Sequence, residues 1–80
     1  FYVYCLYSSK YNKIYIGFTS DLDKRLYFHN NTTNNTYTSK FRPWIIIYSE
    51  ELTDKKSAMI REKQLKSARG RIFLKSFIPE

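Results

Sequence analysis

Aromatic and β-branched residues form a hairpin pattern at the start of the chain. Residues 1–7 are rich in such side chains, which predicts a strand. Residues 8–12 have turn chemistry, and residues 13–18 predict the returning strand of a hairpin.

The hairpin brings several tyrosines onto a common face. Side chains alternate along a strand, so Tyr2, Tyr4 and Leu6 share one face and Val3, Cys5 and Tyr7 the other. With a register centred on the turn, Tyr4 lies opposite or diagonal to Tyr15 or Gly17. Gly17 then allows a close backbone approach or a bulge.

A short amphipathic helix follows the hairpin. Ser20 is the expected N-cap, because its hydroxyl can accept a hydrogen bond from the first turn. Leu22, Leu26 and His29 recur at helical spacing and form the stripe that faces the core. Arg25 lies beside this stripe, one turn away from His29.

The middle of the chain changes from polar to strongly apolar. Residues 30–40 are rich in Asn and Thr and contain no aliphatic residue, which predicts a polar loop. Pro43 then marks the edge of residues 44–48, which read Trp-Ile-Ile-Ile-Tyr. Because this run is apolar throughout, it predicts a strand buried on both faces.

Two helices are expected in the last third of the chain. Thr53 or Asp54 is the N-cap of the first, which is expected over residues 56–68. Gly70 is expected to end this helix, and residues 71–78 predict a short last one.

The length and composition indicate one small domain. A chain of 80 residues allows a single domain over residues 1–80. The aromatic content is 19%, and most of these rings are expected in the core because they bury much area. Cys5 is the only cysteine, which excludes an internal disulfide and suits a reducing compartment, so we expect a cytoplasmic protein. The strand-like start predicts no signal peptide, and one Cys with one His is too few for structural zinc.

The charge balance favours a polyanionic partner. Lys and Arg number 14 against 7 Asp and Glu, which gives a formal net charge of +7. DNA or RNA is the simplest partner for such a chain. An anionic membrane is the competitor, but we expect no membrane association, since there is no long apolar run and no lipid-like amphipathic helix.

Glu62 departs most from its surroundings. It lies on the same helical line as Ala58 and Leu65, within the stripe expected to be buried. A buried carboxylate is costly unless it is paired or binds a cation. Two interpretations follow: Glu62 binds Mg²⁺ or Mn²⁺ at a phosphate site, or it forms an ion pair with a neighbouring Lys or Arg.

Four other side chains suit phosphodiester chemistry. The Arg25 guanidinium can clamp a phosphate, although a solvated helix position is the plainer interpretation. His29 can relay a proton, or it can be a half-buried residue at a helix end. Tyr4 and Tyr15 are core rings by default, but a nearby cation would favour the phenolate and make a usable base.

Taken in order, these residues resemble the motifs of the GIY-YIG nuclease superfamily, most closely its small stand-alone, excision-nuclease-like domains. Ten residues separate Tyr4 from Tyr15, as in that family. The matching segments are Tyr2-Val3-Tyr4, Tyr15-Ile16-Gly17, the arginine motif over residues 17–26, His29-Asn30, Tyr37-Thr38, Arg42-Pro43 and the glutamate helix over residues 58–66.

The resemblance implies an α/β (α+β) fold, with a three-stranded antiparallel sheet flanked by three helices and a cleft on one sheet face. It also implies a one-metal endonuclease, in which Glu62 binds the divalent metal ion and Arg25 steadies the scissile phosphate. Tyr4 would activate the attacking water, and Tyr15 and His29 would orient or assist that proton transfer. Such a site requires the carboxylate to lie on the same side of the sheet as the phenols and the guanidinium.

The chain departs from the family pattern at two places. The first motif lacks its glycine, because Tyr2 stands before Val3. Many active relatives carry a late asparagine, but no asparagine follows Asn35 in this chain. Lys66 and Lys75 are the candidate substitutes.

Two functions therefore compete. The first is a metal-dependent endonuclease that hydrolyses a DNA phosphodiester bond, with branched or nicked DNA among the candidate substrates. The second is a catalytically weak or inactive nucleic-acid-binding module that needs a partner protein. A partner that supplies specificity, a monomer and a homodimer all stay open, as do roles in DNA repair, recombination or mobile elements. Phosphate contacts are expected from six basic residues: Lys10, Lys13, Lys24, Lys40, Arg42 and Lys66.

Overall fold

A three-stranded sheet with helices on both faces forms the domain. The structure is a computed structural model, and it describes residues 1–31 and 36–79. The elements follow the order β1 (Tyr2–Ser8), β2 (Lys13–Thr19), α1 (Leu22–Asn31), the 3₁₀ helix η1 (Thr38–Phe41), β3 (Ile45–Glu51), α2 (Lys55–Leu65) and α3 (Ala68–Lys75).

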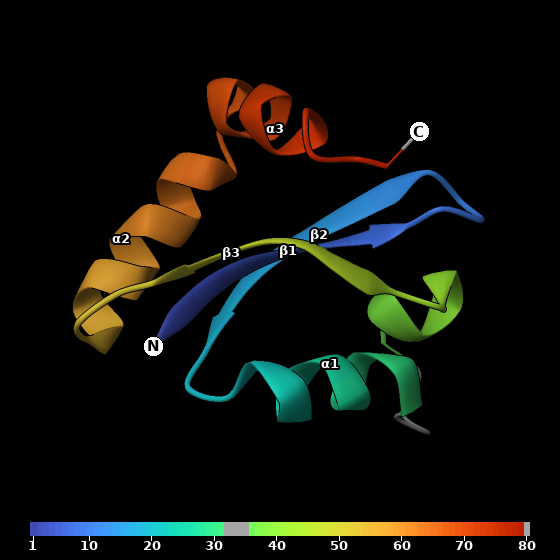
Figure 1. The fold of residues 1–80 in the computed structure, drawn as a ribbon, viewed down its shortest axis with the longest axis horizontal. Coiled ribbons are helices and arrows are strands. Elements are labelled where there is room, and N and C mark those ends of the chain that lie inside the picture. Colours follow the sequence, from blue (N-terminus) through green and yellow to red (C-terminus); the bar gives the residue numbers. More distant parts are fainter. Residues whose placement is uncertain (32–35, 80) are drawn as a thin grey trace.

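The sheet is antiparallel with the strand order β2-β1-β3, so β1 is the central strand. Helix α1 lies on one side of the sheet and α2 and α3 lie on the other (Figure 1). The expected fold class, a three-stranded antiparallel sheet flanked by three helices, is confirmed. No helix in the described part of the chain is long and apolar enough to cross a membrane.

The alternation along β1 feeds two separate cores. Tyr4 and Leu6 pack with Trp44 on the α1 side of the sheet. On the other side, Val3 and Cys5 pack against apolar residues of β2, α2 and α3, namely Ile16, Ala58, Leu65 and Leu74. The two faces predicted for the first strand are therefore confirmed.

The hairpin register decides where the tyrosines meet. Tyr4 pairs with Gly17, and Leu6 pairs with Tyr15. Tyr4 therefore lies opposite Gly17 and diagonal to Tyr15, as the sequence predicts. Asn12 closes the turn with a positive φ of 53°, a conformation that Asn tolerates better than most residues.

Two helix boundaries differ from the sequence prediction. Asp21, rather than Ser20, precedes α1, and its carboxylate accepts a hydrogen bond from the Lys24 amide at 3.1 Å. Gly70 does not end a helix but lies inside α3, whose N-cap is Ser67. A Cβ at Gly70 would lie 2.4 Å from the Leu65 Cα atom, so this glycine serves the close packing of α3 on the end of α2.

Other boundaries also changed. Helix α2 runs over Lys55–Leu65, with Asp54 as its N-cap, which confirms one of the two predicted caps. The predicted loop over residues 30–40 is wrong at both ends, because α1 continues to Asn31 and η1 begins at Thr38. Its residues 32–35 lie outside the described part of the chain.

The third strand is not buried on both faces as predicted. It is an edge strand, and Ile45 at its start is 48% exposed. Trp44 precedes the strand and is buried, with its indole Nε1–H donating to the Thr38 carbonyl at 2.8 Å. Asn30 holds this segment from the end of α1, since its side chain bonds both the amide and the carbonyl of Trp44.

Candidate active site

Tyr4 is the centre of the candidate site. Its side chain projects from the central strand towards α1 and is buried, with 2% of its surface exposed. Its hydroxyl lies 3.0 Å from His29 Nε2 and accepts a longer hydrogen bond from Arg25 Nε at 3.4 Å. Burial raises the pKa of this phenol, while the adjacent Arg25 opposes that rise.

His29 connects Tyr4 to the 3₁₀ helix. Its Nδ1 atom lies 3.0 Å from the Thr38 hydroxyl oxygen, and the imidazole is buried. Because a guanidinium can only donate, the consistent assignment has the Tyr4 hydroxyl donating to Nε2 and the Nδ1–H donating to Thr38. Burial, with the nearby positive charge of Arg25, lowers the pKa of His29 to about 4, so the ring is neutral near pH 7.

Arg25 lies one turn before His29 on α1. Its guanidinium is 4.9 Å from the centre of the Phe28 ring, a cation–π distance that orients it. The hydrogen bond to Tyr4 raises the pKa of Arg25, so its charge is secure. A fixed guanidinium beside a phenol is suited to binding a phosphate oxygen.

Tyr15 completes an aromatic wall around this network. Its ring centre is 4.9 Å from that of His29 and 6.4 Å from that of Tyr4. It also lies 6.4 Å from the ring of Tyr37 and 6.4 Å from that of Trp44. These contacts fix the orientation of the imidazole and extend the wall to the exposed ring of Tyr37.

Gly17 gives the Tyr4 phenol its place. A Cβ at this position would lie 2.6 Å from the Tyr4 hydroxyl oxygen and 2.8 Å from Cζ, closer than atoms can pack. The φ of Gly17 is not positive, so its backbone conformation does not require glycine. Glycine is therefore required here because it leaves room for the Tyr4 phenol to lie over β2.

Glu62 is related to the other four residues less directly. It lies on α2, whose Ala58 and Leu65 pack on the opposite face of the sheet from Tyr4, so the helix does not lie on the side that the one-metal site requires. Its carboxylate is nevertheless close enough to contribute to the raised pKa of the Tyr4 phenol. It forms an ion pair with Lys66 at 3.4 Å, and its side chain is 20% exposed. Of the two interpretations offered for Glu62, the structure shows the ion pair. The partial exposure of the Glu62 side chain still leaves its carboxylate accessible to a ligand.

The six basic residues expected to contact phosphate are spread over several elements. Lys10 lies over the Tyr11 ring and Lys13 over the Phe41 ring, at 5.6 and 5.3 Å. Lys24 and Lys40 are exposed, and Arg42 is half-buried. Lys66 is committed to the ion pair with Glu62.

Comparison with known proteins identifies the family of the chain. The family model described as "GIY-YIG catalytic domain" matches residues 1–75. The chain belongs to the GIY-YIG catalytic domain family. It is therefore a member of a nuclease superfamily, and this membership supports a nuclease-type function on DNA.

Several bacterial proteins are similar over most of the chain. A UPF0213 protein of Staphylococcus haemolyticus is 35% identical over 66 residues, which cover 82% of this chain and 79% of that protein. A UPF0213 protein of Clostridium perfringens is 37% identical over 65 residues, 81% of this chain and 69% of that protein. The UPF0213 protein YazA of Bacillus subtilis is 39% identical over 57 residues, 71% of this chain and 58% of that protein. No solved structure matches the chain.

Members of this family generally depend on a divalent metal ion, and the residues present fit one loosely. No cluster of three or more His, Cys, Asp or Glu side chains suited to a metal occurs among residues 1–31 and 36–79. Mg²⁺, however, keeps several waters and is often held by one or two carboxylates together with substrate phosphates. A single half-buried carboxylate such as Glu62 is compatible with that mode of binding.

Sequence reasoning missed the contribution of Thr38. This buried threonine is hydrogen-bonded to His29 Nδ1, on the opposite edge of the imidazole from Tyr4. In the sequence, only its place after Tyr37 in a segment that resembles the family drew attention to it. A hydroxyl nine positions away from a histidine has no periodicity that would reveal the contact.

Proposed function

We propose that the protein is a metal-dependent DNA endonuclease that hydrolyses a phosphodiester bond with a water molecule activated by Tyr4. The single observation that carries the proposal is the hydrogen-bond chain from Arg25 through the Tyr4 hydroxyl to His29 and Thr38. A buried phenol needs one partner, but this one has both a cation and a neutral imidazole on its single oxygen.

In the proposed reaction, the phenolate form of Tyr4 takes a proton from water. The water oxygen bonds to phosphorus while the bond from phosphorus to the leaving sugar oxygen breaks, and the leaving oxygen takes a proton from solvent water. Arg25 lies beside Tyr4 and carries the positive charge that the crowded, anionic phosphorus centre requires. Before ionisation, the neutral imidazole accepts the hydrogen bond of the Tyr4 hydroxyl and so fixes its direction. The pKa of His29, about 4, makes the imidazole a poor acceptor for the phenolic proton itself.

Glu62 is the residue that would hold a divalent metal ion, with Mg²⁺ and Mn²⁺ as the proposed ions. When bound, the ion would neutralise charge on the phosphate and on the leaving oxygen. Glu62 itself contributes to the raised pKa of Tyr4, so compensation of its negative charge would favour the phenolate. The Lys66 ammonium must then give up its ion pair with Glu62 or share it.

The protonation of Tyr4 sets the pH dependence. Because its pKa is raised above the ordinary value of 10.0, little phenolate is present near neutrality. We expect the rate of cleavage to rise with pH through the alkaline range, by about tenfold per pH unit well below that pKa.

A second candidate function rests on the Glu62–Lys66 ion pair. A carboxylate that is already paired is consistent with a binding module without catalysis, in which the basic residues contact phosphates. Such a module would bind DNA with strong salt dependence and yield no product.

One experiment separates the two functions. The protein is incubated with branched, flapped, nicked and intact duplex DNA in Mg²⁺ or Mn²⁺, and with a chelator as reference. Product that forms at less than one enzyme per substrate, and only with metal, supports the endonuclease. Binding without product under every condition supports the module.

Three variants test the assignment. Glu62→Gln should abolish cleavage and leave DNA binding nearly intact. Tyr4→Phe keeps the ring and should lower the rate by about 10²–10⁴-fold, as expected for loss of a general base. Glu51→Gln removes an exposed carboxylate from β3 and serves as the matched control. If Glu62→Gln cleaves DNA as fast as Glu51→Gln, the assigned site is wrong.

A further inference from the structure

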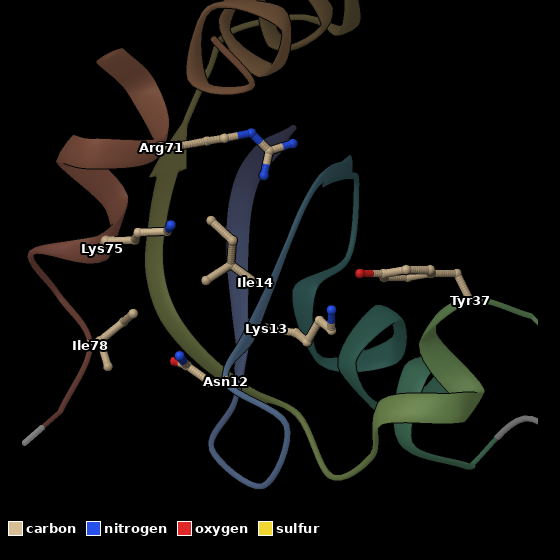
Figure 2. A pocket seen from close by; sticks show the side chains of 7 residues that line it. All are labelled: Asn12, Lys13, Ile14, Tyr37, Arg71, Lys75 and Ile78. Carbon is tan, nitrogen blue, oxygen red and sulfur yellow. The ribbon is translucent and has the colours of Figure 1, made fainter. Parts of the chain in front are cut away.

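A basic pocket lies at the edge of the sheet, outside the Tyr4 network. Its volume is about 320 Å³, at the low end of the pockets that hold small ligands. It is lined by residues of the hairpin, of the segment before η1 and of the α3 region: Asn12, Lys13, Ile14, Tyr37, Arg71, Lys75 and Ile78. Figure 2 shows Arg71 and Lys75 reaching from α3 towards Ile14, while the Tyr37 hydroxyl points in from the opposite side.

The pocket contains cations but no carboxylate among its lining residues. Lys13, Arg71 and Lys75 all line it, and none of them makes an ion pair with a carboxylate in the described ranges. Arg71 is held in place, because its Nε atom donates to the Lys66 carbonyl at 3.2 Å. Ile14 and Ile78 supply apolar walls, which reduce the screening of these charges by water.

The position of the pocket relates it to the candidate active site. Ile14 and Gly17 both lie on the edge strand β2, but Ile14 packs on the α3 side of the sheet and Gly17 faces Tyr4 on the α1 side. The pocket and the candidate active site therefore adjoin the same edge strand from opposite faces of the sheet. Tyr37 lines the pocket and also contacts the Tyr15 ring at 6.4 Å, which places an aromatic surface between the two sites.

We propose that this pocket binds a backbone phosphate of the substrate DNA, at a place separate from the bond that is cleaved. Arg71 and Lys75 supply the positive charge, and the Tyr37 hydroxyl donates a hydrogen bond to a phosphate oxygen. The proposal rests on the proposed nuclease function, which it extends by a second contact on the same strand. It adds Arg71, Lys75 and Tyr37 to the residues that recognise the substrate.

The test compares two variants with the same net charge. Arg71→Gln/Lys75→Gln removes two cations from the pocket, and Arg69→Gln/Lys56→Gln removes two exposed cations outside it. DNA binding is measured by fluorescence anisotropy between 50 and 200 mM salt. For the pocket variant, we expect the slope of log K against log salt to fall by about 0.9 and the affinity at 0.1 M salt to fall by about eightfold. The control variant should keep the slope of the parent.

Lys13→Gln/Lys75→Gln is the second pocket variant, because it leaves the Arg71 bond to Lys66 intact. It should show the same loss, and thermal unfolding checks that each variant is folded. If both pocket variants bind DNA with the affinity and slope of the control, the proposal is wrong. If inorganic phosphate or a mononucleotide occupies the pocket as tightly as DNA does, the pocket is a site for free anions and the proposal is also wrong.

Substrate length gives an independent readout. Oligonucleotides are shortened one nucleotide at a time on either side of the cut, and kcat/KM is measured for each length. The parent should lose activity at the shortening step that removes the phosphate bound by the pocket, whereas the pocket variants should show no loss at that step. If no DNA is cleaved but the pocket variants still bind more weakly, the nuclease function fails and the subsite stands. If cleavage occurs and the pocket variants match the control, the subsite fails and the nuclease function stands.

Discussion

Replacing Gly17 by Ala tests the packing that positions the Tyr4 phenol. The new methyl group would lie 2.6 Å from the Tyr4 hydroxyl oxygen, whereas unstrained contacts begin at about 3.5 Å. The Tyr4 side chain must therefore retreat by about 1 Å. It has little room, because it is 2% exposed and is packed between Leu6 and Trp44.

The expected cost follows from two opposing effects. Crowding a packed core costs about 1–3 kcal/mol, and loss of the Tyr4–His29 hydrogen bond costs about 1 kcal/mol more. Because the φ of Gly17 is not positive, Ala suits its backbone and stabilises by about 0.4–1 kcal/mol through the unfolded chain. The net expectation is a loss of about 1–3.5 kcal/mol. A 1 Å displacement of the phenol should also slow cleavage by about 10²-fold.

Urea unfolding of four proteins measures the effect: the parent, Gly17→Ala, Tyr4→Leu and the double variant. The leucine removes the ring that meets the new methyl group, so in the double variant Gly17→Ala should cost almost nothing. The coupling energy between the two sites should be about 1–3 kcal/mol. If Gly17→Ala is as stable and as active as the parent, the phenol does not lie over Gly17, and the geometry of the whole network is wrong.

Three further predictions concern His29, Gly70 and Thr38. The pKa of His29 is about 4 in the folded protein, below its ordinary value of 6.5. Between these two pH values the unfolded chain binds a proton on His29 that the folded chain does not. The free energy of unfolding should therefore fall by about 3 kcal/mol as the pH is lowered from 6.5 to 4. Urea unfolding across that range measures this fall, and it should be absent in His29→Gln. Gly70→Ala should cost more than about 3 kcal/mol in the same assay, because its methyl group meets the Leu65 backbone, which cannot rotate away. Thr38→Val leaves the Nδ1–H of His29 without its acceptor, so it should cost about 1–3 kcal/mol and slow cleavage, whereas Thr53→Val at an exposed site should do neither.

Local patterns predicted the elements that carry the site. The alternation in β1 placed Tyr4 and Cys5 on opposite faces, and the turn limited the neighbours of Tyr4 to Tyr15 and Gly17, of which Gly17 is its direct partner. Helical spacing brought Arg25 next to His29 on α1. These predictions succeeded because each depends on residues close together in sequence, where strand and helix geometry leave few alternatives.

The errors arose where tertiary contacts override local signals. Gly70 has the character of a helix end, but here it allows two helices to pack closely. The apolar run at Ile45 and its neighbours suggested a central strand. The position of a strand in a sheet depends on long-range pairing, however, and β3 pairs only with β1 in the described sheet. The link from His29 to Thr38 crosses between elements, so no spacing rule could predict it.

The central position of β1 has a consequence for anyone who screens variants of this domain. Val3 and Cys5 anchor one layer while Tyr4, their neighbour in the same strand, carries the proposed chemistry in the other. A substitution that disturbs the packing of Leu74 against Val3 and Cys5 is therefore expected to shift the Tyr4 phenol without changing any residue in contact with it. A variant without activity in such a screen is ambiguous until its fold has been verified. Substitutions in one layer must therefore be designed together with the packing of the other.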